Sequence, residues 1–213
     1  DKHAFDALPM TDRVRYLTLK KEAVGEFVKE KYFTCILKTE EAEKIFDQDY
    51  EIFFWRGLCY VQCNDDAEAI KQYQRVLKIY KGNITVSMNL FEVLYTSKQY
   101  TKCIVISNKL RSLYKKPQFP RNHIPLLEFK RLICLKKIQE TQPDPSTLKE
   151  IELLSDLYTS NQDSPFAYYV QALNQYEKKE HKSGDLRIAA AVYVFNKESV
   201  VRWNKALSDI GYI

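Results

Sequence analysis

Glycine, proline and histidine are scarce in this sequence, with 5 Gly, 7 Pro and 3 His among 213 residues. Because Gly and Pro are the residues that interrupt helices, their scarcity predicts a mostly helical chain with short connections. The histidines lie far apart, and no cysteine or carboxylate stands at metal-ligand spacing from them. The sequence also lacks a Gly-rich phosphate loop, a nucleophile elbow and a Glu-x-x-His pair. We therefore expect no enzyme activity, no metal and no cofactor.

Long apolar runs and a strong charge of one sign are also missing. No run approaches the roughly 20 apolar residues of a membrane helix, so we expect no transmembrane segment. A net charge of +5 is too small to indicate a nucleic-acid-binding tail. The five cysteines are odd in number and occupy apolar or small helix positions, which predicts reduced core thiols in the cytoplasm, or alternatively the nucleus. Because the sequence opens on Asp1 without a signal-like segment, we expect a fragment of a longer chain.

Residues 50–83 carry the clearest pattern in the chain. Apolar or small residues recur every three or four positions over 53–61 and again over 69–80, with a polar turn at 64–66 between them. This spacing predicts two amphipathic helices that form a hairpin. Gly82 and Asn83 are expected to close the second helix, because Gly, and to a lesser degree Asn, tolerates a left-handed backbone there.

The same pattern recurs along the chain at one fixed interval, without a gap. Cys35, Ala69 and Cys103 coincide at this interval, and such small residues let neighbouring helices approach closely. A helical pair that repeats about every 34 residues resembles the tetratricopeptide repeat. The middle copy carries the family's series of large, small and aromatic residues, namely Phe53, Gly57, Tyr60, Ala69, Tyr73 and Val76. The helix-ending proline common in the family is absent from all three copies.

The resemblance implies an all-α fold, a right-handed α-solenoid of antiparallel helix hairpins in a single domain. We expect regular repeats at about 16–49, 50–83 and 84–114, a linker at 115–123, degenerate repeats at 124–163 and 164–197, and a capping helix at 198–213. Within the last repeat, a polar loop is expected at 180–185. The capping helix is expected to cover the final hydrophobic face, as repeat arrays require.

In this family the first helix of each hairpin lines a concave groove. Carried over by position, the predicted partner-binding residues are Lys20, Val24, Phe27, Phe54, Trp55, Leu58, Val61, Met88, Asn89, Glu92 and Tyr95. A mostly apolar floor with aromatic anchors fits an apolar helix, an extended peptide or another subunit of a complex. The alternative for Trp55 is packing within the chain's own core.

Chaperone-binding members of the family grip a C-terminal carboxylate with a set of Lys, Asn and Arg side chains. Here only Lys20 matches that set, and Val24, Trp55, Thr85 and Asn89 replace the others. One cation without a fork of donors holds a carboxylate poorly. We therefore predict that the chain does not bind chaperone tails.

These features predict a non-catalytic protein–protein interaction scaffold. An RNA-binding helical repeat is the alternative, suggested by basic residues around the linker: Lys115, Lys116, Arg121, Lys130, Arg131, Lys136 and Lys137. Repeats that read bases keep polar side chains at fixed groove positions. This groove instead offers Leu58 and Val61, so binding of protein is favoured.

Overall fold

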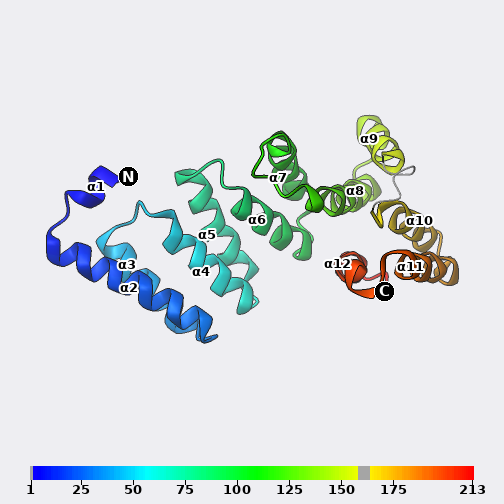
Figure 1. Cartoon of the computed structure of the whole chain (residues 1–213). Helices are drawn as coiled ribbons and strands as arrows, with labels where there is room; N and C mark the ends of the chain where they lie inside the picture. Colours follow the sequence, from blue (N-terminus) through cyan, green and yellow to red (C-terminus); the bar gives the residue numbers. More distant parts are fainter. Residues whose placement is uncertain (1, 158–163) are drawn as a thin grey trace. The chain divides into compact units, whose positions relative to one another are not determined.

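The chain is helical throughout the part that the structure describes. The structure, a computed structural model, describes residues 2–157 and 164–213. These residues form twelve α-helices and one 3-10 turn without any β-strand, which confirms the all-α prediction (Figure 1). The chain divides into two compact units, unit 1 (Asp1–Ser97) and unit 2 (Lys98–Ile213).

Unit 1 consists of helices that each pack against the next in the chain. They are α1 (Lys2–Asp6), α2 (Met10–Val28), α3 (Tyr32–Ile45), α4 (Tyr50–Gln62), α5 (Asp66–Ile79) and α6 (Ile84–Thr96). Packing between consecutive partners runs from α2 through α6. The pair α2/α3 covers 10–45, where a hairpin was expected at 16–49, and the pair α4/α5 covers 50–79, where one was expected at 50–83; α6 begins at Ile84.

The turn inside each hairpin repeats with the sequence period. Glu30 and Asn64, which occupy the same position in successive repeats, both have a left-handed backbone, with φ of 60° and 58°. In each turn the N–H of the next residue in the chain donates a hydrogen bond to the carbonyl oxygen five residues before it, over 2.9 Å. This bond satisfies a carbonyl group at the helix end. Lys98, at the same position of the next repeat, has a φ of 58°.

The predicted helix closure at Gly82 and Asn83 is wrong. Helix α5 ends at Ile79, and Asn83 instead begins α6, where its side-chain oxygen accepts a hydrogen bond from Val86 N over 3.0 Å. Asn is among the best residues for this N-cap position, because its short side chain reaches an otherwise unpaired N–H. The sequence pattern alone did not distinguish the end of one helix from the start of the next.

Small residues set the close approach of helices in unit 1. Ala23, Cys35 and Cys59 are buried together, at the interface of α2, α3 and α4. A Cβ atom added to Gly57 would lie 2.6 Å from a ring carbon of buried Tyr73, so no larger residue fits without a shift. These contacts explain why the small positions recur at the repeat period.

Unit 2 contains the remaining helices. They are α7 (Tyr100–Leu113), the 3-10 turn η1 (Arg121–His123), α8 (Ile124–Thr141), α9 (Pro145–Asp156), α10 (Phe166–Glu177), α11 (His181–Phe195) and α12 (Lys197–Ser208). The pairs α8/α9 and α10/α11 fall in the two repeats expected at 124–163 and 164–197. The end of the first of these, 158–163, lies outside the described residues.

Helix α8 is the central helix of unit 2. It packs against α7, α9, α10 and α12, and all nine residues from 127 to 135 are buried. Trp203 of α12 lies beside Phe129 and Tyr169, with ring centroids 5.4 Å apart in both pairs. The helix expected to cap a hydrophobic face therefore does cover apolar surface within unit 2.

The polar loop expected at 180–185 is wrong, because α11 already begins at His181. Gly184 is buried within this first turn, where an added Cβ would lie 2.6 Å from a ring carbon of Tyr176. The polar residues around Gly184 lie on the exposed side of the helix. Packing of one buried glycine against a tyrosine thus outweighs the loop-like composition.

Candidate functional site

The predicted groove residues all lie in unit 1, on the first helices α2, α4 and α6. Ten of the eleven are half-buried, as expected for side chains that both support the fold and contact solvent. The exception is Tyr95, whose side chain has 0% exposure and stacks on Phe91 at a centroid distance of 6.5 Å. Tyr95 is therefore a core residue, and its assignment to an accessible floor is corrected.

Aromatic rings join α2 and α4 along this surface. The ring centroids of Phe27 and Trp55 are 5.2 Å apart, and those of Phe54 and Trp55 are 5.6 Å apart. Phe27 and Trp55 also pack on the buried cluster formed by Ala23, Cys35, Ile36 and Cys59. Trp55 therefore has one side in the interior and one side toward solvent, so both interpretations made from the sequence apply to it in part.

Lys20 marks a charged end of the same surface. Its ammonium pairs with Asp49 Oδ2 over 2.7 Å and with Glu51 Oε2 over 2.6 Å. Tyr16 donates to the same Asp49 oxygen over 2.9 Å, and the other oxygen caps α4 by accepting from Glu51 N over 2.9 Å. This network ties α2 to the N-terminus of α4 and leaves Lys20 fully engaged with carboxylates.

The ionisation of these groups follows from their contacts. Burial opposes charge on Asp49, but hydrogen bonds from Lys20, Glu51 N and Tyr16 outweigh it and hold the pKa of the carboxyl below its ordinary value. Burial likewise opposes the charge on Lys20, yet its hydrogen bonds to Asp49 and Glu51 raise its pKa. Burial and the nearby Asp49 charge raise the pKa of Tyr16. At neutral pH the network is therefore an ion pair with a neutral tyrosine.

The α6 end of the surface is partly used by the fold itself. The Asn89 side chain hydrogen-bonds Tyr73, whose pKa is nevertheless raised because the phenol is buried. Met88 and Glu92 are half-buried on the same helix. The predicted surface thus changes from charged at Lys20, through aromatic at Trp55, to mixed at α6.

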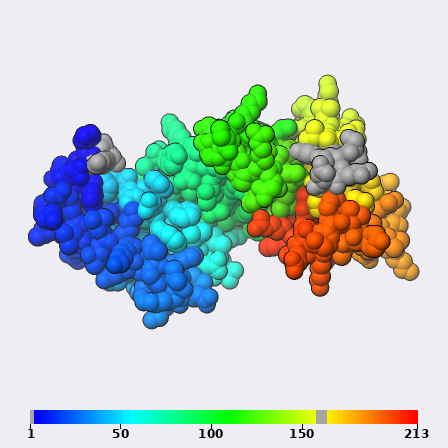
Figure 2. All heavy atoms as spheres, in the orientation of Figure 1, coloured from blue at the N-terminus to red at the C-terminus, as the bar shows by residue number. Residues whose placement is uncertain are grey.

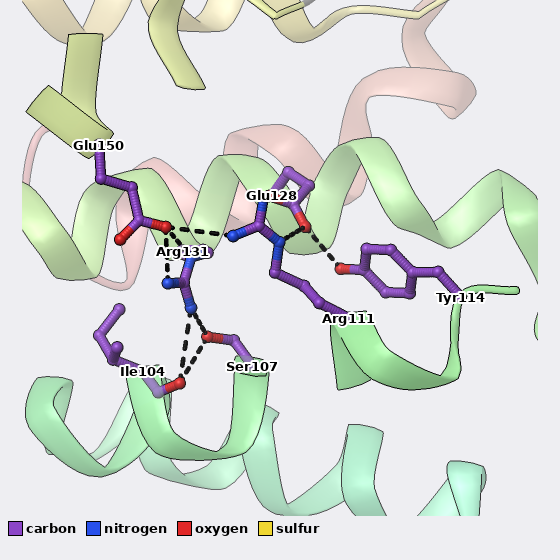
Figure 3. Close-up of polar contacts among 7 residues, drawn as sticks. All are labelled: Ile104, Ser107, Arg111, Tyr114, Glu128, Arg131 and Glu150. Carbon is purple, nitrogen blue, oxygen red and sulfur yellow. Dashed lines mark hydrogen bonds and ion pairs between the residues drawn. The ribbon is translucent and has the colours of Figure 1, made fainter. Parts of the chain in front are cut away.

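Of the seven basic residues behind the RNA-binding alternative, two are buried and two are half-buried, whereas Lys115, Lys116 and Arg121 are exposed. Arg131 is only 3% exposed, and its guanidinium reaches Glu150 of α9 over 2.7 Å and also Ser107 of α7 (Figure 3). Lys130 is buried as well, and Lys136 pairs with Glu177 over 2.7 Å. Sequence reasoning treated these side chains as one surface cluster, because local sequence does not show which faces of α8 are covered.

Buried Glu128 and exposed Arg111 complete the polar network of unit 2. Glu128 Oε1 accepts from Tyr114 over 2.8 Å and lies 3.3 Å from Arg111 Nε (Figure 3). Arg111 also reaches Glu150 over 3.1 Å. Sequence analysis missed these residues, and the one available signal was the presence of Glu, Lys and Arg within the apolar stretch 124–138.

Residues 2–157 and 164–213 contain no group of three or more His, Cys, Asp or Glu arranged to hold a metal ion. None of the helices in those ranges combines the length and apolar character needed to cross a bilayer.

Comparison with known proteins identifies the fold. No family model matches the sequence, and no curated protein does. Solved structures do match. MamA matches with a TM-score of 0.56 and 12% identity over 85% of this chain and 97% of its own. YrrB, described as a TPR protein with an unusual peptide-binding site, matches with a TM-score of 0.56 and 14% identity over 83% of this chain and 84% of its own. PilW, described as a type IV pilus biogenesis factor, matches with a TM-score of 0.55 and 13% identity over 96% of this chain and 88% of its own. The chain therefore has a tetratricopeptide-like helical-repeat fold.

Proposed function

We propose that this chain is a non-catalytic interaction scaffold that binds an apolar helix or extended peptide of another protein on the surface formed by α2, α4 and α6. The observation that carries the proposal is the row of half-buried side chains along the first helices, with Phe27, Trp55 and Phe54 in mutual contact at its centre. Aromatic side chains that are half-covered by the fold provide large contact area at small entropic cost, so they make effective anchors. The fold match to a TPR protein described as having a peptide-binding site agrees with this use.

The charges of this surface favour an apolar segment over an acidic tail. Lys20 is already paired with Asp49 and Glu51, so an incoming carboxylate would compete with two carboxylates for one ammonium group. A single-domain scaffold in the cytoplasm remains the prediction for organisation and location. RNA binding is the weaker candidate, because four of the seven basic residues near α8 are buried or paired, and only Lys115, Lys116 and Arg121 are exposed.

A peptide selection tests this function. Peptides selected from a random library on the immobilised chain should be rich in apolar residues, and Trp55→Ala should lower their affinity at least about tenfold, or about 1.4 kcal/mol. The same change should lower the melting temperature by only a few degrees, since part of the Trp55 side chain is exposed.

Leu37→Ala on α3 is the matched control, because Leu37 is 58% exposed and lies outside the proposed surface. It should leave peptide affinity unchanged. If Trp55→Ala instead abolishes folding stability while any residual folded chain keeps full affinity, Trp55 is a core residue and the proposed surface is wrong.

A further inference from the structure

Helix α2 has a second apolar face, on the side away from its packing partners. Its buried residues are Tyr16, Leu19 and Ala23. The opposite side exposes large apolar residues, with exposures of 67% for Met10, 51% for Val14, 53% for Leu17 and 75% for Val28. Figure 2 shows α2, in blue, at the surface of the face drawn. A helix that is apolar on two opposite sides is normally covered on both.

The exposed apolar residues follow the spacing of a coiled-coil seam. Positions 10, 14, 17, 21, 24 and 28 alternate steps of four and three, and all but Lys21 are apolar. This is the spacing at which one helix inserts side chains between those of another. These six residues are called the α2 seam below. At 1.5 Å per residue the 19-residue helix offers a docking length of about 28 Å.

A hollow opens beside the middle of the α2 seam. Its volume is about 460 Å³, and its wall includes Leu17, Tyr50, Ile79 and Tyr80. Ile79 and Tyr80 are 44% and 48% exposed, so apolar surface continues from α2 onto the end of α5. The hollow is large enough to admit a bulky apolar side chain from a helix lying on the seam.

On α2 itself the charges beside the seam are cationic, and Asp49, which also lines the hollow, is already paired with Lys20. At 100° per residue, Arg13 and Lys21 lie on the seam side of α2, whereas its three acidic residues, Asp12, Glu22 and Glu26, lie on other sides. Glu22 and Glu26 already pair with Lys38 and Lys29, each over 2.9 Å. The Arg13 guanidinium donates to Met10 Sδ over 3.7 Å, and its buried Nε has no partner in the described part of the chain. The seam therefore offers cations that carboxylates of a partner could pair with.

We propose that the α2 seam binds an amphipathic helix of a partner protein, one with apolar residues at the same three-and-four spacing and with carboxylates beside them. A second copy of this chain fits less well, because a parallel pairing brings Lys21 against Lys21, an antiparallel pairing brings Lys21 against Leu17, and the seam has no carboxylate of its own to pair with Lys21 in either case. This interaction goes beyond the proposed function, since the seam shares only Val24 with the surface around Trp55.

A pair of synthetic helical peptides tests the proposal. Each is about three heptads long with Leu at the a and d positions, and one carries Glu and the other Lys at the e and g positions. The Glu peptide should bind the chain, measured by fluorescence anisotropy, at least about tenfold more tightly than the Lys peptide. Its affinity should fall with added salt, because the contacts with Arg13 and Lys21 are exposed to solvent.

Leu17→Glu should weaken binding of the Glu peptide at least about tenfold, whereas the matched Leu37→Glu change on α3 should not. Trp55→Ala should leave this affinity unchanged, which separates failure of the seam from failure of the proposed function. Equal binding of both peptides, no binding of either, or equal effects of Leu17→Glu and Leu37→Glu would overturn the proposal. So would a dimer in sedimentation equilibrium that Leu17→Glu abolishes, because the seam would then hold a second copy.

Discussion

The same three-helix polar arrangement occurs in both units, with its charges exchanged. In unit 1, Arg56 of α4 pairs with Glu43 of α3 over 2.6 Å, and Glu43 also pairs with Arg75 of α5. In unit 2, Arg131 of α8 takes the place of Arg56. Its neighbours are Arg111 of α7, at the position of Glu43, and Glu150 of α9, at the position of Arg75. One carboxylate links two guanidinium groups in each case.

The positions of these residues obey a simple register. Arg111 follows Glu43 by two full repeats. Arg131 follows Arg56, and Glu150 follows Arg75, by a longer interval that is the same for both pairs. The hydroxyl that the central arginine reaches is equivalent as well: Arg56 Nε donates to Thr39 over 3.0 Å, and Arg131 donates to Ser107, two repeats after Thr39. The linker at 115–123 thus lengthens the chain between α7 and α8 without changing how α7, α8 and α9 meet.

The two units differ in the side chain that lies next to these charged residues. In unit 1 the Arg75 guanidinium lies 3.8 Å from the centroid of the Phe53 ring. The position of Phe53 is taken in unit 2 by Glu128, which is 2% exposed and has one oxygen, Oε2, without a partner in the described part of the chain. The comparison teaches that the fold preserves the geometry of these three charged positions, which we call the triad. The central position is arginine in both units, whereas the charges of the two outer positions can be exchanged if both change together.

The two tryptophans allow each unit to be followed separately. Trp55 lies in unit 1 and Trp203 in unit 2, and the chain has no other tryptophan. In a Trp203→Phe background, fluorescence reports unit 1, and in a Trp55→Phe background it reports unit 2. The three tests below use these backgrounds.

The largest effect is expected from reversing one charge of the unit 1 triad. Glu43→Arg would place three guanidinium groups together and leave buried Arg56 uncompensated, which should destabilise unit 1 by about 3–5 kcal/mol in urea unfolding. Adding Arg75→Glu recreates the charge order of unit 2 and should recover most of that loss. A double variant no more stable than Glu43→Arg alone would show that the two triads are not equivalent.

A second test compares the two glycines that lie against tyrosine rings. Gly57→Ala in unit 1 and Gly184→Ala in unit 2 each place a Cβ 2.6 Å from a ring carbon, of Tyr73 and Tyr176 respectively. Both should destabilise their own unit by about 1–3 kcal/mol, because the rings are buried and cannot move freely.

Gly25→Ala is the matched control for these changes. A Cβ at Gly25 meets no atom within 4 Å, so this substitution should stabilise α2 by up to about 1 kcal/mol through helix propensity. Equal effects of all three substitutions on the melting temperature would show that contact with a tyrosine ring is not the reason why glycine is needed at 57 and 184.

The smallest effect is expected from the Asp49 charge, and it depends on pH. Because the pKa of Asp49 is lower in the folded chain, its charge stabilises unit 1 above the unfolded pKa of about 3.9. That stabilisation is lost as the pH falls through the folded pKa. Asp49→Asn keeps a capping side chain but not the charge, so it should lower the melting temperature at pH 7. It should also reduce the further drop in melting temperature that occurs below about pH 4. Parallel pH profiles for the two proteins would contradict this.

Sequence reasoning located the hairpins but not all of their contacts. The repeat period predicted two hairpins in the region that α2 to α5 occupy, because the small residues at Ala23, Cys35, Gly57 and Ala69 are required wherever two helix axes approach closely. It misplaced the end of α5, because Asn83 caps α6 and does not close α5, and it misplaced the start of α11, where Gly184 lies against a tyrosine ring. It also placed Tyr95 at the surface, although the side chain is buried.

The sequence by itself determined the helical repeat, since apolar spacing and small residues depend on one helix and its immediate neighbour. Only the tertiary structure decided which charges are surface charges. Arg131 and Lys130 look like a basic patch in the sequence, but α8 is covered on all sides between 127 and 135. Which faces of a helix are covered depends on helices far away in the chain, and local spacing carries no record of them.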